Sequence, residues 1–449
     1  MRILPFMKKY ISAIFILLIL NNTVFAKEYE FKPLNLYSVK DRILILSPHP
    51  DDEVIGTAGI IQKAQRCNIP LKIVYLTNGD NNEPSFIVDQ KRLVLLPKAV
   101  LTMGKKRIYE AINGMNSLGV KRDQLVFLGY PDWGTEKIFT SFWFDKKPFK
   151  SMLTRVRHVP YEEALSPGAP YLGESILKDL IKIIQDFKPT KIFVSHPIDT
   201  HRDHRAFFLF LQIALWDLEV EPEIYGYLVH WNRWPYRKQL FITPPKDWPI
   251  KDTTWFSWNL DEVDIKKKRQ AISFYKTQIG YNPPFLFSFV RQNELFSDIK
   301  ISDLSQYSEF NIEDSVVYKK DASFVYIKLK SDILEIETKQ LQIFLIGYKK
   351  QVPFNQMPKI RIDIGSTKNL SVYDKGININ VPDAKIEIDN KTKEVFIRFP
   401  IGSLNYPDNI LTFFDHRKSY LKTERSWWVI KMLDSPTILS QYDSKIINN

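Results

Sequence analysis

The chain has 449 residues, a formal net charge of +12 at pH 7, and 44% hydrophobic and 14% aromatic residues. This length exceeds that of one ordinary domain, so we expect two globular domains, each with its own core. The positive charge fits an anionic partner, such as an envelope polymer, or ordinary solvated lysines. No run of basic residues interleaved with aromatics marks a nucleic-acid module, so no nucleic-acid partner is expected.

The first 26 residues resemble a secretory signal peptide. Arg2, Lys8 and Lys9 form a positive start, an apolar run follows at 10–20, and Ala26 ends a stretch that a signal peptidase can cleave. We therefore expect a signal peptide at 1–26 and an exported protein, periplasmic or extracellular. The apolar run is shorter than the about 20 residues that cross a bilayer, so no membrane span is expected after cleavage. An uncleaved anchor is the alternative.

From residue 27 to residue 298, short apolar runs alternate with amphipathic segments, which is typical of a mostly parallel, Rossmann-like α/β sheet flanked by helices. Strands are predicted at 43–46, 71–76, 125–128, 191–194 and 223–230, and helices at 54–65, 105–118, 175–187, 203–218 and 261–277. We expect the single cysteine, Cys67, on the buried face of a helix. We expect the basic run at 266–269, within the last helix, on a solvated face.

Between residues 133 and 173 the regular pattern fails, and eight aromatic residues lie among lysines and prolines. Loops of this length in compact domains are usually functional. We therefore expect a lid or a substrate wall here.

Residues 299–449 are predicted to form an all-β, sandwich-like domain. Period-two alternation marks strands at 323–330, 341–347, 359–364, 377–381, 385–389, 394–399 and 410–414. Near the end of this region, Trp427 and Trp428 are expected in the core. Sugar binding and simple structural support are both open as roles for this domain.

Two clusters of histidine and aspartate each follow a predicted strand. His49 to Glu53 reads His-Pro-Asp-Asp-Glu, and His196 to His204 reads His-Pro-Ile-Asp-Thr-His-Arg-Asp-His. Open α/β sheets bind ligands at the carboxyl ends of their strands. If the two strands are neighbours, the clusters meet there.

Together the clusters offer a hydrolytic metal site. The candidate ligands are His49, Asp52, His201 and His204, with Asp51 and Asp203 beside them. Zinc accepts such nitrogen and oxygen ligands at about 2.0–2.2 Å, and a catalytic site keeps one position for water. Asp51 is placed to act as the base, and Asp203 to orient a histidine. Each residue could instead cap a helix, but both clusters doing so is improbable.

The first cluster, together with His201-Arg202-Asp203-His204, resembles the PIG-L/LmbE-like family of zinc-dependent de-N-acetylases, which act on N-acetylglucosamine-type sugars on a Rossmann-like fold. The resemblance extends through Thr77-Asn78-Gly79-Asp80 and Leu128-Gly129-Tyr130-Pro131-Asp132, and it covers residues 41–296. It implies His49, Asp52 and His204 as metal ligands and Asp51 as the general base. It also implies His201 as the group that stabilises the oxyanion, and Arg107 and Asp132 as contacts to sugar hydroxyls.

The sequence thus predicts an exported hydrolase, with Zn²⁺ as cofactor, that removes an acetyl group from an N-acetylated amino sugar in a glycan or glycoconjugate. Nitrogen and oxygen ligands do not fix the metal, so another divalent ion such as Fe²⁺ is the alternative cofactor. The alternative functions are a metal-dependent hydrolase of another amide or ester, and a carbohydrate-binding envelope protein without activity.

Overall fold

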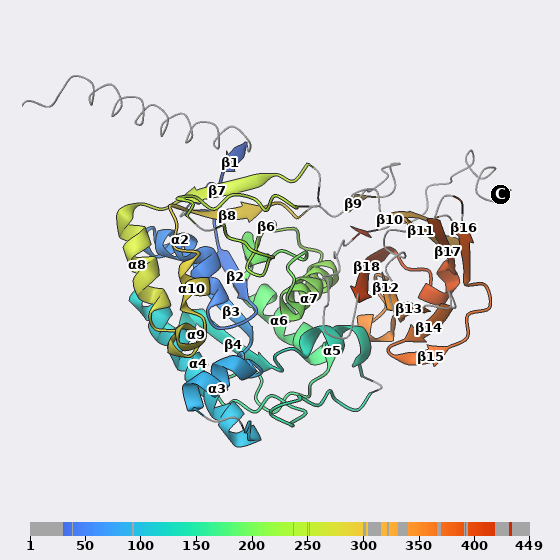
Figure 1. Cartoon of the computed structure of the whole chain (residues 1–449), viewed down its shortest axis with the longest axis horizontal. Coiled ribbons are helices and arrows are strands. Elements are labelled where there is room, and N and C mark those ends of the chain that lie inside the picture. The colour runs from blue at the N-terminus through green and yellow to red at the C-terminus, as the bar shows by residue number, and fades with distance from the viewer. Residues whose placement is uncertain are drawn as a thin grey trace, which may run out of the picture.

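The computed structural model describes residues 30–37, 39–91, 94–144, 146–236, 238–248, 250, 252–299, 302–303, 316–320, 323–330, 340–365, 370–389, 391, 394–417 and 431–432 (Figure 1). The expected signal peptide at 1–26 lies outside these residues, and so do Trp427 and Trp428. Among the described helices, none combines the length and the apolar character that crossing a membrane requires.

An eight-stranded, mostly parallel sheet forms the centre of the first part of the chain. Its order is β1 (Phe31–Pro33), β7 (Trp255–Asn259), β8 (Asn293–Ser297), β6 (Glu223–Tyr227), β5 (Lys191–Ser195), β2 (Ile43–Ser47), β3 (Leu71–Thr77) and β4 (Leu125–Tyr130). The neighbouring pairs from β6 to β4 are all parallel, whereas β8 is antiparallel to β6 and β7. Residues of β2 and β5 are buried throughout, because helices cover both faces of the sheet.

Helices α2 (Asp52–Arg66), α4 (Pro97–Ser117) and α8 (Glu262–Ile272) pack together on one side of the sheet, and α6 (Gly173–Phe187) and α7 (Arg202–Leu218) pack together on the other (Figure 1). The shorter helices are α3 (Glu83–Gln90), α5 (Thr135–Ser141), α9 (Lys276–Tyr281) and α10 (Pro283–Phe287). The α/β architecture predicted from the sequence is confirmed.

Four details differ from the prediction. The helix expected at 261–277 is interrupted after Ile272, so that α8 and α9 are separate. The basic run does not lie wholly on a solvated face, because Lys268 is fully buried. The strand predicted at 223–230 ends at Tyr227 rather than at residue 230. Cys67 is only partly buried and follows the last residue of α2, so it does not lie on a buried helix face.

The expected lid at 133–173 is mostly core. Phe139, Trp143, Tyr161 and Tyr171 are almost fully buried, and α5 forms within this segment. Trp133, in contrast, is 50% exposed and lines the cavity described below. The aromatic residues here therefore hold the loop against the domain, and of those named Trp133 alone serves as a wall.

The C-terminal region is a β-sandwich, as predicted. One sheet has the order β10 (Val316–Lys320), β11 (Phe324–Lys330), β17 (Glu394–Pro400) and β16 (Lys385–Asp389). The other has the order β15 (Ile377–Ile379), β14 (Leu370–Asp374), β13 (Lys359–Gly365), β12 (Gln340–Tyr348), β18 (Asn409–Arg417), β19 (Lys431–Met432) and β9 (Ser302–Asp303). All seven strands expected from the sequence are present, and side chains of the two sheets share one apolar core.

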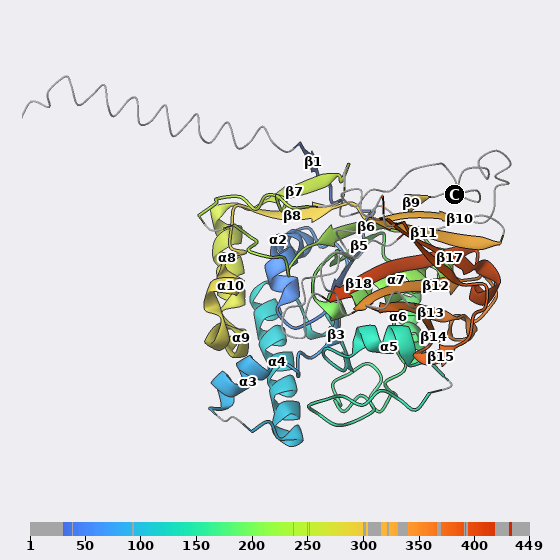
Figure 2. The same ribbon diagram turned by 45° about the vertical axis from the view of Figure 1, so that its right-hand side comes forward.

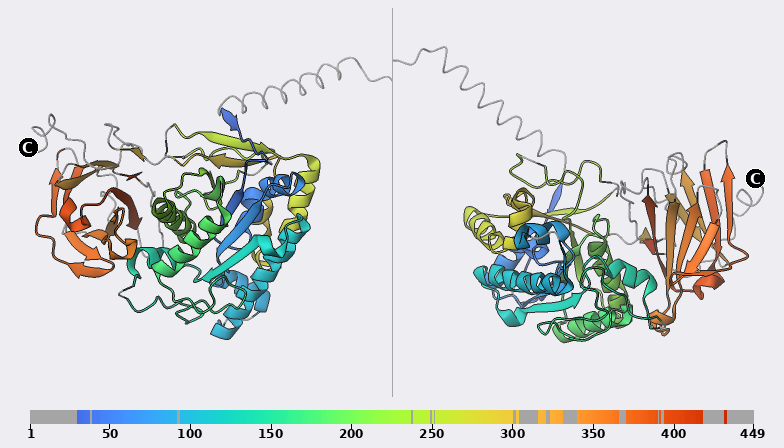
Figure 3. Two further views of the ribbon diagram at one scale, coloured as in Figure 1. Left: turned by 180° about the vertical axis from the view of Figure 1, so that it is seen from behind. Right: turned by 60° about the horizontal axis from the view of Figure 1, so that its bottom comes forward.

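A second apolar contact joins the sandwich to the α/β part. Phe344, Tyr348 and Phe354 belong to the same cluster as the core of the α/β sheet. Figures 2 and 3 show β12 and β18 beside α5 and α7. The eight-stranded sheet ends at Ser297, and all later described strands belong to the other two sheets. The division into 27–298 and 299–449 stays a prediction, and one apolar core crosses it.

Candidate metal centre and active site

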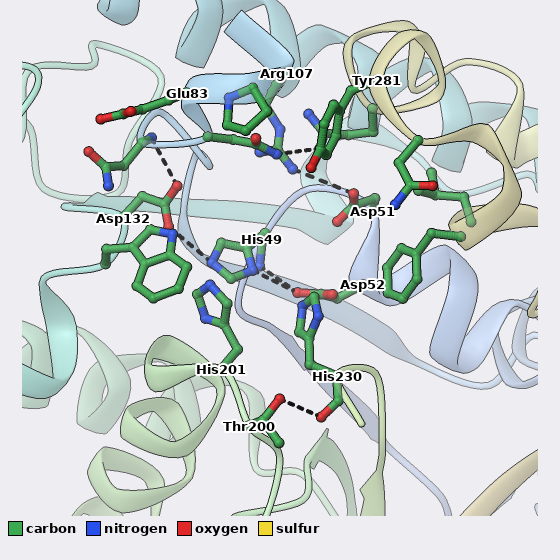
Figure 4. A pocket seen from close by; sticks show the side chains of 18 of the residues that line it. His49, Asp51, Asp52, Glu83, Arg107, Asp132, Thr200, His201, His230 and Tyr281 are labelled. Atoms are coloured by element: carbon green, nitrogen blue, oxygen red, sulfur yellow. Dashed lines mark hydrogen bonds and ion pairs between the residues drawn. The ribbon is translucent and has the colours of Figure 1, made fainter. Parts of the chain in front are cut away.

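The two histidine clusters meet where the sequence predicted. β2 and β5 are parallel neighbours, with Ile43 paired to Lys191, so their carboxyl ends lie at the same edge of the sheet. A cavity of about 680 Å³ opens at this edge (Figure 4). Residues from both clusters line it, including His49, Asp51, Asp52 and His201.

His49, Asp52 and His204 bring three ligand atoms together. Asp52 Oδ2 lies 3.1 Å from His49 Nδ1 and 3.1 Å from His204 Nε2, and the two nitrogens are 3.3 Å apart. Ligands held tetrahedrally at about 2.0–2.1 Å from a zinc ion would be roughly 3.3 Å from one another. These spacings would allow the three atoms to share one divalent cation, and all three side chains are buried; His49 and His204 also lie within reach of His201, and Asp52 and His204 within reach of His230.

Carboxylates lie next to the ring nitrogens of both histidines that face away from the three-atom cluster. His49 Nε2 lies 3.2 Å from Asp132 Oδ1 and 3.4 Å from Asp203 Oδ2. A proton on Nε2 can be donated to these oxygens, which leaves Nδ1 unprotonated and able to bind a metal. In His204 the two ring nitrogens have the opposite roles. Its Nδ1 lies 3.4 Å from Asp199 Oδ2, and its Nε2 faces the site. Metal-binding histidines usually have such partners.

Asp51 lies beside the three ligands but points away from them. It precedes the first residue of α2 and has a φ of 130°, which costs a residue with a Cβ atom about 1–3 kcal/mol. Asp51 Oδ2 is 3.6 Å from Arg107 Nη2, so the carboxylate turns toward that side of the cavity (Figure 4). Burial raises the pKa of Asp51 to about 8, while the Arg107 guanidinium acts in the opposite direction.

His201 precedes the first residue of α7 and faces the cavity. Its Nδ1 accepts a hydrogen bond from the Asp203 backbone N–H at 3.3 Å, so in the neutral ring the proton is on Nε2. Burial lowers the pKa of His201 well below its usual value. The ring centroid lies 4.6 Å from that of His49. His201 can therefore present a neutral N–H donor next to the three ligands.

Arg107 and Asp132 both line the cavity and both hold the site together. Arg107 donates to the carbonyl of Gly79 at 2.8 Å and to that of Pro50 at 2.7 Å. At Gly79 the φ is +62°, and a Cβ atom there would overlap the Arg107 guanidinium. Asp132 accepts from the Asn81 backbone N–H at 2.9 Å and also faces His49. Their predicted contact with sugar hydroxyls stays a prediction.

Asp203 is fully buried and ties the loop after β4 to the start of α7. Its carboxylate accepts from the Trp133 backbone N–H at 2.6 Å, from the Thr135 backbone N–H at 3.2 Å and from the Thr135 hydroxyl at 2.5 Å. The same carboxylate faces His49 Nε2. It is thus placed to orient a histidine, the role suggested by its sequence position.

Comparison with known proteins places this site in a family. Residues 44–215 match the family model described as PIG-L: GlcNAc-PI de-N-acetylase. The chain is also similar to the probable N-acetyl-alpha-D-glucosaminyl L-malate deacetylase 2 of Bacillus subtilis (strain 168). The identity is 33% over 157 residues, which is 34% of this chain and 67% of that protein. The chain belongs to the PIG-L family.

Two solved structures resemble this PIG-L chain. One is described as N,N'-diacetylchitobiose deacetylase from Pyrococcus horikoshii in complex with its inhibitor; the match covers 57% of this chain and 82% of that chain, with 20% identity and a TM-score of 0.37. The other is described as the deacetylase of antimicrobial reagent A40926 pseudoaglycone. That match covers 58% of this chain and 97% of the other chain, with 18% identity and a TM-score of 0.37. At these TM-scores neither adds to the assignment, which rests on the sequence matches.

Within the PIG-L domain, sequence reasoning gave no role to two residues of the site. His230 lines the cavity, with its ring 4.8 Å from that of His204 and stacked on Phe285. It follows β6, the parallel neighbour of β5. The rule that ligands bind at the carboxyl ends of the strands, which located the first two clusters, could therefore have found it. Glu53 was quoted in the motif, but its bonds are set by tertiary structure, and no spacing in the sequence indicates them.

Proposed function

We propose that this PIG-L protein is a zinc-dependent hydrolase that removes the acetyl group from an N-acetylated amino sugar of the N-acetylglucosamine type. The observation that carries the proposal is the arrangement of three ligand atoms 3.1–3.3 Å apart with a separate carboxylate, Asp51, beside them. The relatives' names, which are those of deacetylases acting on N-acetylated sugars, support the same substrate class.

His49, Asp52 and His204 would hold the cation. Two imidazoles and one carboxylate suit zinc, with Fe²⁺ as the alternative. When bound there, such a cation polarises a carbonyl group and lowers the pKa of a water ligand toward about 7.

The residues around the three ligands supply the proton transfers. A carboxylate oxygen of Asp51 accepts a proton from the water that attacks the acetamide carbonyl carbon. The N–H at His201 Nε2 donates a hydrogen bond to the oxygen that becomes negatively charged in the tetrahedral intermediate. As the C–N bond breaks, Asp51 returns its proton to the nitrogen. The products are acetate and a free amino sugar, so one water is consumed for each bond cleaved.

We also propose that the protein acts outside the cytoplasm, on a glycan or glycoconjugate of the cell envelope or of the extracellular space. The support is the sequence of residues 1–26, which resembles a cleavable signal peptide. The net charge of +12, which becomes 12 − 3 = +9 when Arg2, Lys8 and Lys9 are removed with the signal peptide, suits an anionic envelope polymer.

Replacing Asp51 tests this function directly. Wild-type protein should release acetate from an N-acetylated hexosamine, and Asp51→Asn should lower kcat by about 10²–10⁴-fold because the base is lost. The metal content should be unchanged, since Asp51 is not among the three ligands. The measurements are acetate release and metal analysis of the purified proteins.

Two results would contradict the proposal. Near-normal turnover of Asp51→Asn would remove this residue from the mechanism. Acetate or acid release from acyl esters or other amides, but from no N-acetyl sugar, would instead favour a different hydrolase at the same site. His204→Ala serves as the control that should lose both metal and activity.

A further inference from the structure

The residues that line the cavity come from two groups of elements, and we name two parts of the lining after them. The inner half is the part around His49, Asp52 and His201, which follow β2 and β5, and it holds the proposed reaction centre. The outer half is walled by Trp133 and by residues at the start of α3 and along α9 and α10, among them Asn81, Asn82, Gln278, Tyr281 and Phe285. The family model matches residues 44–215. The wall made by α9 and α10 therefore lies beyond the part of the chain that the PIG-L model describes.

Aromatic rings are available on opposite sides of the cavity. Trp133 is 50% exposed, and its ring centroid lies 4.4 Å from that of His201. Its φ is 60°, an unusual value for a residue with a bulky side chain, and the Asp203 carboxylate accepts from its backbone N–H. Tyr281 is 44% exposed, and Figure 4 shows it across the cavity from His201.

The outer wall is a fixed structure. Asn82 Nδ2 donates to Gln278 Oε1 at 3.0 Å, and Ser85 Oγ donates to the Thr277 carbonyl at 2.7 Å, so that α3 is tied to α9. On α4, Glu110 accepts from the backbone N–H of Thr277 at 2.9 Å and from its hydroxyl at 2.6 Å. Tyr281 thus stands on a helix that two others hold in place.

The polar groups of this wall are mostly side-chain amides. Asn81, Asn82, Gln278 and Asn282 all line the cavity. Within the described part of the chain, the buried Asn81 Oδ1 has no hydrogen-bond partner. Amides donate and accept hydrogen bonds, as hydroxyl groups do, and exposed rings cover apolar faces. A ligand with hydroxyl groups and a flat apolar face can donate to the unpartnered Asn81 Oδ1 and cover an exposed ring, whereas an alkyl chain would leave that oxygen unpaired.

We propose that the outer half of the cavity is a subsite for a second sugar ring, with Tyr281 as its determinant. The substrate is then an N-acetylated hexosamine linked to at least one further sugar, with the acetamide in the inner half and the neighbouring ring against Tyr281. This proposal rests on the proposed function and specifies its substrate class.

The test compares N-acetylglucosamine with its β-1,4-linked disaccharide, N,N'-diacetylchitobiose. Wild-type protein should have at least a tenfold higher kcat/KM for the disaccharide. Tyr281→Ala should lower kcat/KM for the disaccharide about tenfold, mainly through KM, and leave the monosaccharide value unchanged. Tyr109→Ala is the matched control, because Tyr109 is a 56% exposed tyrosine of α4 that does not line the cavity; it should change neither value.

Equal kcat/KM for the two sugars in wild-type protein, or an equal loss for both in Tyr281→Ala, would overturn the subsite. A long-chain alkyl glycoside of N-acetylglucosamine provides a further comparison. If Tyr281→Ala lowers kcat/KM for this glycoside as much as for the disaccharide, the site accepts an apolar aglycone instead. Calorimetric titration of wild-type and Tyr281→Ala protein with the disaccharide provides a readout without turnover. Weaker binding to Tyr281→Ala with no acetate release from any sugar would support the subsite and refute the proposed function.

Discussion

Asp51 occupies a backbone conformation that its neighbours must stabilise. Glu53 Oε2 accepts a hydrogen bond from the Asp51 backbone N–H at 2.9 Å and another from the Ser47 hydroxyl at 3.1 Å. The other oxygen of Glu53 accepts from the Tyr275 hydroxyl. Glu53 is fully buried, so these bonds are made away from solvent. It thereby fixes the peptide that carries the proposed base, and we regard it as a positioning residue.

Glu53→Ala should therefore lower kcat by about 100-fold, the order of effect expected when a reacting group is misplaced by 1 Å. Glu53→Gln should retain most of the activity, because an amide oxygen can still accept from the Asp51 N–H. KM and metal content should change little in either protein. Steady-state kinetics and metal analysis measure this.

If Glu53→Gln were as impaired as Glu53→Ala, the negative charge rather than the hydrogen bond would be the important property. The positioning role would then be wrong.

At the scale of single residues, the sequence indicated the proposed ligands and one supporting carboxylate, Asp203, but not the other supports. His49, Asp52 and His204 could be proposed because two strands end beside them and because their pattern resembles a family. Which carboxylate faces which ring nitrogen depends on loops from β4 and α7 that approach only in the folded chain. For that reason the contacts of Asp132 and Asp199 with the histidines could not be predicted.

Among the elements, α8 contains a buried charge that stabilises the fold. Lys268 Nζ donates to the Ile55 carbonyl at 2.8 Å and to Glu294 Oε1 at 2.7 Å. The Glu294 carboxylate also accepts from the Gly59 backbone N–H at 2.9 Å. One ion pair thus joins α8 to α2 and β8, beneath the turn that carries the site.

Lys268→Ala should reduce the free energy of unfolding by about 3–5 kcal/mol, because it leaves Glu294 buried without its cation. Lys266→Ala is the control; Lys266 is exposed on the same helix, and its removal should change stability by about 0.5 kcal/mol or less. Urea unfolding of the two variants measures the difference. Similar decreases in the free energy of unfolding of the two variants would show that the ion pair contributes no net stability.

The wrong prediction for the basic run has a specific cause. Four consecutive cations suggest a solvated face, but a helix turns by 100° per residue, so a run of four must reach its inner side. The buried residues of α8 are Asp264, Lys268, Ala271 and Ile272, which follow helical spacing. Phasing from Ala271 and Ile272 would have placed Lys268 inside.

Over the whole molecule, one apolar core connects the two parts of the chain. Phe354 is almost fully buried, and its ring centroid lies 5.0 Å from that of Trp143 and 5.9 Å from that of Phe139. On the same side of the interface, Tyr348 lies 5.0 Å from Trp216 of α7. The β-sandwich is thus packed against the helix that begins with the second histidine cluster.

Phe354→Ala should therefore destabilise the full-length protein by about 3–5 kcal/mol and still give one unfolding transition. Ile377→Ala is the control, since Ile377 is 54% exposed and its loss should have little effect. Thermal unfolding followed by circular dichroism and by acetate release checks this. Two separate transitions, with activity lost only in one, would mean that the parts fold independently.

The sequence predicted the sandwich and its seven main strands, but not its contact with the α/β part. Along β12, Leu341, Ile343 and Leu345 face the sandwich core, whereas Phe344 and Ile346 belong to the other cluster. A strand that is apolar on both faces indicates burial on both sides. That signal is present in residues 343–346, but it does not say what covers the second face.

Helix α7 extends from His204 in its first turn to Trp216 near its end. Its 17 residues form a rod of roughly 26 Å, and a stiff rod transmits rotation from one end to the other. A chain with a different module in place of the sandwich would then need another support for the far end of this rod. Exchanging the module without that support would tilt the histidine, so successful chimaeras should retain an aromatic partner for Trp216.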